Sequence, residues 1–176
     1  MSLFKAPRHL SYLSFAALFM VIVILAACGF RPVHQFKNDQ SIQQDLWSIN
    51  VSPIAGRDGL VLRNRLLEKF SPRGNTDAPE YQLSVQLTKT TEALLIQLDN
   101  TATRINLKMN AVFVLLNLTT EATVYKGSAY SVGSYNVVES EFATVAAGKN
   151  TADRVAQAVG EEIFDLLVIY FNGASS

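Results

Sequence analysis

The chain has 176 residues, of which 49% are hydrophobic, and its 15 basic side chains equal its 15 acidic ones. This length and composition suit one folded domain with a core. The balanced charge argues against a nucleic-acid partner, since proteins that bind nucleic acid usually carry an excess of Lys and Arg. The chain contains one cysteine, which excludes an internal disulfide, so the thiol must be buried, bonded to another chain or modified.

The first 27 residues have the order of a secretory signal peptide. Lys5, Arg8 and His9 come first, and thirteen consecutive apolar residues follow from Phe15 to Ala27. This run is shorter than the roughly 18 apolar residues of a spanning helix. Counting back to Leu10 lengthens it to 18 positions, some of them polar, so an uncleaved membrane anchor remains the alternative.

The single cysteine ends this segment in the sequence Leu25–Cys28, which resembles the bacterial lipobox. Its small residues let a signal peptidase close around an extended backbone. The resemblance implies that Cys28 becomes an acylated mature N-terminus, whose several chains, palmitate among them, attach the protein stably to a membrane. Gly29 stands where an aspartate retains enterobacterial lipoproteins at the inner membrane, which implies the outer membrane. The alternative is a buried cysteine inside a membrane helix.

Behind the signal peptide, residues 1–27, we expect two further regions. Residues 28–45 form the lipidated N-terminus and a polar tether, and residues 46–172 form one domain. Cleavage removes Lys5 and Arg8, so the mature chain has two more acidic than basic side chains.

Four strands are predicted from alternation of apolar and polar residues. They are residues 46–51, 81–88, 105–116 and 124–135. The second is the clearest, because every other residue from Tyr81 to Leu87 is apolar. The fourth contains Gly127 and Gly133, a pattern typical of a twisted or bulged strand.

Two helices are predicted from apolar residues that recur every three or four positions. In residues 58–70 these are Leu62, Leu66 and Phe70, and the second helix covers residues 151–171. Its stripe consists of Val155, Val159, Ile163, Leu166 and Tyr170, with Ala152, Ala156 and Ala158 allowing close approach of a neighbour. The predicted fold class is therefore α+β, with a four-stranded, mostly antiparallel sheet and two helices packed on one face.

The other face of this sheet changes character along the third strand. Its polar residues give way to Val112, Val114 and Leu116, which predicts that something covers that end. An intramolecular loop and a partner are both open, and the loop is favoured.

Catalytic chemistry is scarce in the predicted domain. The only histidines are His9 and His34, outside residues 46–172, so neither a histidine-activated nucleophile nor a histidine metal site is expected there. We expect no enzyme and no cofactor. Glu139 and Glu141, pointing one way from an extended segment, leave a lipid-anchored hydrolase as an alternative, although a solvated face is favoured.

Four segments in order carry a resemblance to a known family: the lipobox with CGFRPVH, the strand YQLSVQLTKT, the segment TATRINLKMNAVFVL and the tail SYNVVESEFATVAAGKNTADRVAQAVGEEIFDLLVIYF. Together they resemble LptE, the LPS-assembly lipoprotein family, in its alphaproteobacterial form. The resemblance covers almost all of the mature chain. It implies a lipid-anchored protein on the periplasmic side of the outer membrane that plugs the LptD barrel, assists its assembly and takes part in lipopolysaccharide transport to the outer leaflet.

Lipopolysaccharide is anionic, so its binding requires Lys or Arg. The loop Leu98–Thr101, where family members carry basic residues, has none. Arg104, Lys108 and Lys126 are the nearest candidates for lipopolysaccharide binding. For each, the alternative is a strand charge that keeps the sheet soluble.

The sequence also allows a second function. An auxiliary lipoprotein of a phospholipid-transport system has a similar signal and a mixed α+β body. It would bind inner-membrane transporter subunits instead of a barrel.

Overall fold

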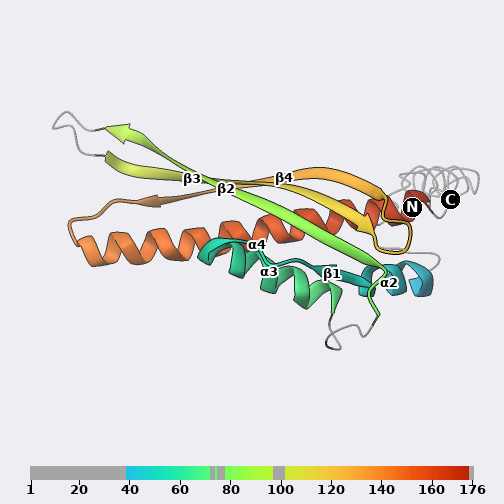
Figure 1. Ribbon diagram of the computed structural model, residues 1–176. Helices are drawn as coiled ribbons and strands as arrows, with labels where there is room; N and C mark the ends of the chain where they lie inside the picture. Colours follow the sequence, from blue (N-terminus) through green and yellow to red (C-terminus); the bar gives the residue numbers. More distant parts are fainter. Residues whose placement is uncertain (1–38, 72–73, 75–77, 97–101, 175–176) are drawn as a thin grey trace, which may run out of the picture. The chain divides into compact units, whose positions relative to one another are not determined.

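The computed structural model describes residues 39–71, 74, 78–96 and 102–174 (Figure 1). The predicted signal peptide and the acylation site Cys28 lie outside these residues. The helices and strands, in chain order, are α2 (Asp39–Trp47), β1 (Ile49–Val51), α3 (Gly56–Phe70), β2 (Tyr81–Ile96), β3 (Ala102–Asn117), β4 (Thr123–Asn136) and α4 (Glu141–Ala174).

The four strands form one sheet in the order β1-β2-β3-β4. The short β1 runs parallel to β2, with Ile49 opposite Tyr81, and the other two pairings are antiparallel. β2 and β3 are paired from Tyr81 opposite Asn117 to Ile96 opposite Ala102. The predicted α+β class and mostly antiparallel sheet are therefore confirmed.

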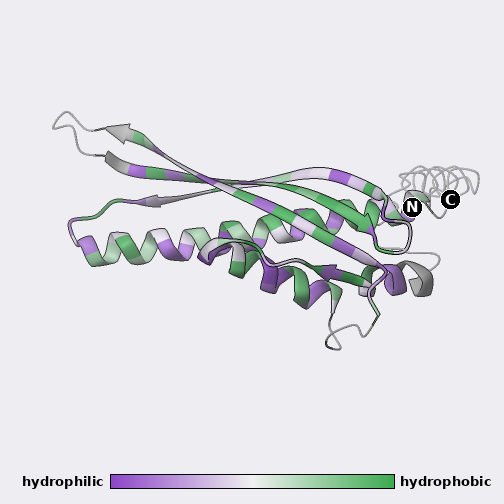
Figure 2. Cartoon of the chain, viewed as in Figure 1, coloured by the Kyte–Doolittle hydropathy of each residue, from purple (hydrophilic) through white to green (hydrophobic). Residues whose placement is uncertain are grey.

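The helices α3 and α4 cover one face of the sheet (Figure 1). The core between them contains alternate residues of each long strand and one stripe of each helix. Figure 2 shows the corresponding alternation of apolar and polar residues along β2, whereas the second half of β3 is apolar on both faces. Its largest fully buried side chains are Phe70, Phe113, Ile49, Leu62, Leu66, Leu83, Met109, Leu115, Ile163, Leu167, Val51 and Val159.

The prediction of a strand over residues 46–51 is wrong at its start, because α2 continues to Trp47. Leu46 belongs to this helix and is buried, so its burial alone does not distinguish a helix from the predicted strand. Ser48 ends the helix, since its amide donates to the Gln44 carbonyl at 3.0 Å and its hydroxyl to the Asp45 carbonyl at 2.7 Å. Residues 39–45, assigned to the tether, are therefore helical.

The last helix begins ten residues before the predicted Thr151. Ser140 caps it, because the Ala143 amide donates to the Ser140 hydroxyl at 3.3 Å and the Thr144 amide to the Ser140 carbonyl at 3.0 Å. These first turns carry no buried stripe, which is why apolar periodicity misses them. Of the three predicted alanine contacts, Ala152 and Ala156 are buried, whereas Ala158 is exposed.

The two glycines of β4 serve close packing on the helix side. A Cβ on Gly127 would lie 2.6 Å from Cζ of Phe113, and one on Gly133 would lie 2.6 Å from Cγ2 of Val155 in α4. The register shift between β3 and β4 falls instead between Leu115 and Leu116. The bulge therefore lies between Thr123 and Tyr125, at the start of β4, and at neither glycine.

Candidate functional site

The face of the sheet that points away from α3 and α4, here called the open face, carries all three candidate cations. Side chains alternate between the faces of a strand, so the open face holds the even-numbered residues of the paired strands, opposite the buried Leu107 and Met109. Its exposed members include Ser84, Gln86 and Thr88 of β2, Arg104, Lys108 and Val112 of β3, and Lys126, Ser128, Tyr130 and Val132 of β4.

Arg104 and Lys108 occupy one end of the open face. The Arg104 guanidinium donates to the Ser134 hydroxyl, from Nη2 at 2.6 Å and from Nε at 3.2 Å. The Lys108 ammonium lies 5.1 Å from the ring centroid of Tyr130. Four residues along one strand separate the two cations by about 13 Å, so a large anionic molecule can contact both.

Lys126 lies on the same face but away from this pair. It stands opposite Val114 in the β3–β4 register, whereas Lys108 stands opposite Val132. Six residues along the strand correspond to roughly 20 Å. The structure therefore brings Arg104 and Lys108 together and leaves Lys126 apart.

The open-face cations differ from those beside α3 in their pairing. Within the described ranges, Arg104, Lys108 and Lys126 have no carboxylate within 4.0 Å. On the helix side four cations form salt bridges with described carboxylates, namely Arg57, Arg65, Lys69 and Lys89. No described carboxylate therefore neutralises the charges of the open face.

Three exposed apolar side chains accompany these cations. Tyr130 is 65% exposed, and Val112 and Val132 are each 51% exposed. The predicted intramolecular cover is therefore wrong for Val112, while the predicted partner stays open. The site combines exposed positive charge with apolar surface, and this combination suits a molecule that has anionic groups and apolar chains.

Sequence reasoning missed Tyr130 and Val132 as members of this face. In the structure Gly133 packs against α4, so the residues on either side of it point to the opposite face, and the local sequence does not specify this packing.

The glutamate pair of the hydrolase alternative does not form the predicted arrangement. Glu141 is the first residue of α4 and Glu139 lies in the connection before it, so the two do not project from one extended segment. Both side chains are exposed.

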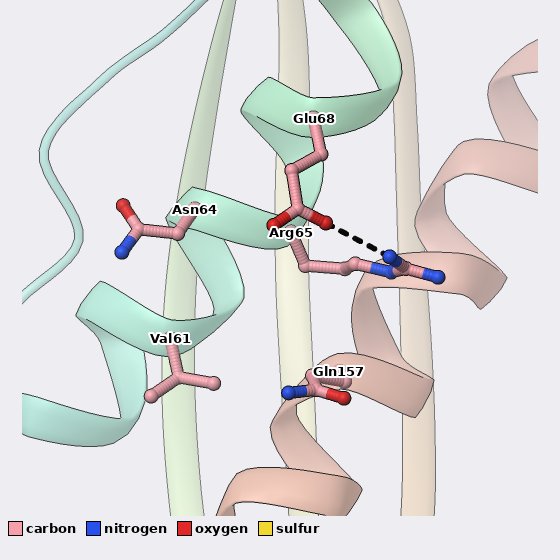
Figure 3. A pocket seen from close by; sticks show the side chains of 5 residues that line it. All are labelled: Val61, Asn64, Arg65, Glu68 and Gln157. Carbon is pink, nitrogen blue, oxygen red and sulfur yellow. Dashed lines mark hydrogen bonds and ion pairs between the residues drawn. The ribbon is translucent and has the colours of Figure 1, made fainter.

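A groove of about 370 Å³ between α3 and α4 is lined by Val61, Asn64, Arg65, Glu68 and Gln157 (Figure 3). Arg65 donates to Glu68 at 2.8 Å and also pairs with Glu161 of α4. Its hydrogen bonds to Glu68 and Glu161 raise the pKa of Arg65. The guanidinium therefore ties the two helices together.

The described residues contain no group of three or more His, Cys, Asp or Glu placed to hold a metal ion. They also include no helix that is both long and apolar enough to cross a membrane.

Comparison with known proteins places the fold among bacterial lipoproteins. A candidate lipoprotein of Caulobacter crescentus CB15 has a TM-score of 0.63 at 23% identity, covering 76% of this chain and 97% of its own. The rare lipoprotein B of Shewanella oneidensis has a TM-score of 0.57 at 10% identity, covering 73% and 98%. A minor lipoprotein of Acinetobacter baumannii has a TM-score of 0.52 at 13% identity, covering 70% and 92%.

In sequence, the chain is 24% identical over 156 residues to an uncharacterized protein of Rickettsia prowazekii (strain Madrid E), which covers 88% of this chain and 96% of that protein. No family model matches the chain. The structural comparisons establish that this protein shares the fold of the solved lipoproteins, with the four strands and the helices described above.

Proposed function

We propose that the protein is an outer-membrane lipoprotein of the LptE family, which plugs the LptD barrel, assists its assembly and takes part in lipopolysaccharide transport. The observation that carries the proposal is the open face, where Arg104 and Lys108, which form no salt bridge with a described residue, lie beside exposed apolar side chains. Lipopolysaccharide has both anionic groups and acyl chains, so it matches this surface chemically.

Attachment to the membrane is assigned to Cys28, the acylated residue of the lipobox. The fold shared with solved lipoproteins supports this assignment. Acylation provides attachment without a spanning helix in the domain.

The plug role is supported by the mixed surface of the domain. The lumen of a large membrane barrel is polar, so a plug needs a rigid body with a polar exterior. Three long strands backed by a 34-residue helix provide the rigid body. Ser84, Gln86 and Thr88 make part of the open face polar.

The lipid contact is tested by reversing the two clustered charges. In a titration of detergent-solubilised full-length protein with lipopolysaccharide, Arg104→Glu with Lys108→Glu is expected to weaken binding about tenfold or more, since hydrogen bonds to charged groups contribute roughly 1.5–3 kcal/mol each. Recovery of the LptD barrel with the protein should not change.

A matched control changes the same amount of charge elsewhere. Lys149→Glu with Arg154→Glu alters two exposed cations of α4 and should leave the affinity for lipopolysaccharide as it is in the wild type. Equal affinity of the open-face variant and this control would assign Arg104 and Lys108 to solubility.

A further inference from the structure

The first turns of α4 extend past the start of α3. The two helices run in the same direction, with Arg57 bonded to Asp153 near the start of α3 and Arg65 packed against Gly160 further along. Since α3 begins at Gly56, the α4 residues before Asp153 have no α3 residue beside them (Figure 1).

The side of α4 that α3 covers continues into this extension. An α-helix has 3.6 residues per turn, so Phe142 lies five complete turns before Gly160. A Cβ on Gly160 would lie 3.2 Å from Cγ of Arg65 and 3.3 Å from Cδ1 of Leu62, both in α3. By the same geometry, Val145 lies within about 20° of the buried Ala156. The extension therefore presents apolar side chains on a face that packs against protein elsewhere in the helix.

These side chains are exposed in the domain itself. Phe142 is 84% exposed, Val145 is 49% exposed, and Val138, just before the helix, is 50% exposed. Single exposed apolar residues are common on proteins, but three gathered at one helix end indicate an interaction surface. We call these three residues the Phe142 anchor.

The charges around the Phe142 anchor indicate the chemistry of the partner surface that it fits. Glu139 and Glu141 both come just before Phe142 in the chain, and both are exposed. An anionic membrane surface would repel them, whereas a protein pocket with an apolar floor and a basic rim complements them. Lys149, also exposed, follows one turn after Val145 and provides a position for an acidic group of the same partner.

The Phe142 anchor also lies at the end of the sheet remote from the start of the domain. The α4 helix follows Asn136, which pairs with Arg104 at the start of β3. β1 pairs with the first residues of β2, and Tyr81 stands opposite Asn117 at the other end of β3. Sixteen residues of strand separate the two ends by about 50 Å.

We propose that the Phe142 anchor inserts into an apolar, basic-rimmed pocket on a protein partner and docks the far end of the domain. The identity of this partner rests on the function proposed above, which makes it the LptD barrel. The contact is separate from the open face, because α4 packs on the opposite side of the sheet.

Photo-crosslinking of the full-length protein in cells tests this contact directly. A benzoylphenylalanine in place of Phe142 is expected to form an adduct with the barrel, identified by mass spectrometry. The same probe in place of Ile169, which is 62% exposed near the other end of α4, provides the control and should give no comparable adduct. A Phe142 probe that forms no adduct, or that captures only a second copy of the chain or only lipid, would overturn the proposal.

A substitution series separates this inference from the proposed function. Phe142→Ser is expected to reduce co-purified barrel about tenfold or more, as for a central interface residue, without changing the melting temperature. Ile169→Ser should behave as the wild type. Wild-type protein that recovers no barrel would refute the proposed function, whereas recovery unaffected by Phe142→Ser would refute the anchor alone. A lowered melting temperature in Phe142→Ser would assign the residue to folding and also overturn the anchor.

Discussion

At the scale of single residues, Leu83 is a core side chain of the strand that lies between β1 and β3. It is fully buried, and it stands opposite Val51 in the parallel pairing of β1 with β2 and opposite Leu115 in the antiparallel pairing with β3. Its neighbour Ser84 points to the other face and is exposed. Adjacent residues of the strand therefore have opposite environments.

This contrast predicts different outcomes for the same substitution. Leu83→Asp places an unpaired charge in the core at a cost of several kcal/mol, which is comparable to the roughly 5–15 kcal/mol that stabilise a whole domain. We expect it to unfold the protein, while Ser84→Asp should change the melting curve little. Thermal unfolding followed by circular dichroism checks both variants. If Leu83→Asp melts as the wild type does, β2 faces the other way.

The sequence pattern predicts which cations lie on the open face, but it does not predict which apolar residues are exposed beside them. Arg104 and Lys108 are predicted from their charge and their positions on one strand, and the structure places both on one face. The exposure of Tyr130 and Val132 depends on packing between Gly133 and α4, which the local sequence does not specify.

At the scale of elements, α3 and α4 are joined by charges at the margin of an apolar contact. Glu161 of α4 pairs with Arg65 and Lys69 of α3, and Lys69 also lies over the ring of Phe164. Burial alone would raise the pKa of Glu161, but hydrogen bonds from Lys69 and Arg65 outweigh it and lower the pKa below its ordinary value of 4.5.

This lowered pKa predicts how the helix pair responds to pH. The stabilisation by Glu161 is complete above the unfolded-state value of about 4.5 and is lost as the pH falls through the lower folded-state pKa. Because its side chain is 36% exposed, Glu161→Gln should reduce the free energy of unfolding at pH 7 by at most about 1 kcal/mol. The difference from wild type should vanish in strong acid. Denaturant titrations across this pH range measure it.

The adjacent Glu162 provides the control for this titration. It is exposed, and no salt bridge joins it to a described residue, so Glu162→Gln should have little effect at any pH. A pH-independent loss in Glu161→Gln would show that packing, and not charge, accounts for its contribution.

The sequence predicts the helices that bury an apolar stripe, but it does not predict helical segments that are mostly exposed. The sequence predicts a helix over residues 58–70, and α3 begins only two residues earlier, at Gly56, because Leu62, Leu66 and Phe70 form a stripe that faces the core. The first ten residues of α4 form a capped but mostly exposed helix, so periodicity of burial gives no signal there. The short α2 has no clear apolar stripe, so the sequence does not predict it and places Leu46 in a strand instead.

At the scale of the whole domain, the two sides of the sheet differ in how charge is used. Salt bridges hold α3 to its neighbours, through Asp153 of α4 and through Lys89 of β2. On the open face, the described cations lack such carboxylate partners and lie beside exposed apolar residues. One side of the sheet therefore builds the domain, and the other is proposed to meet lipopolysaccharide.

Purification of a C-terminally tagged full-length protein from detergent-solubilised outer membranes tests the central claim most directly. We expect a large barrel protein in roughly equal amount, retained in about 1 M salt, where the Debye length of about 3 Å weakens surface electrostatic contacts. Cys28→Ala provides the control, since it removes the proposed acylation site. Recovery of inner-membrane transporter subunits, or of no partner at all, would contradict the plug function and, in the first case, favour phospholipid transport.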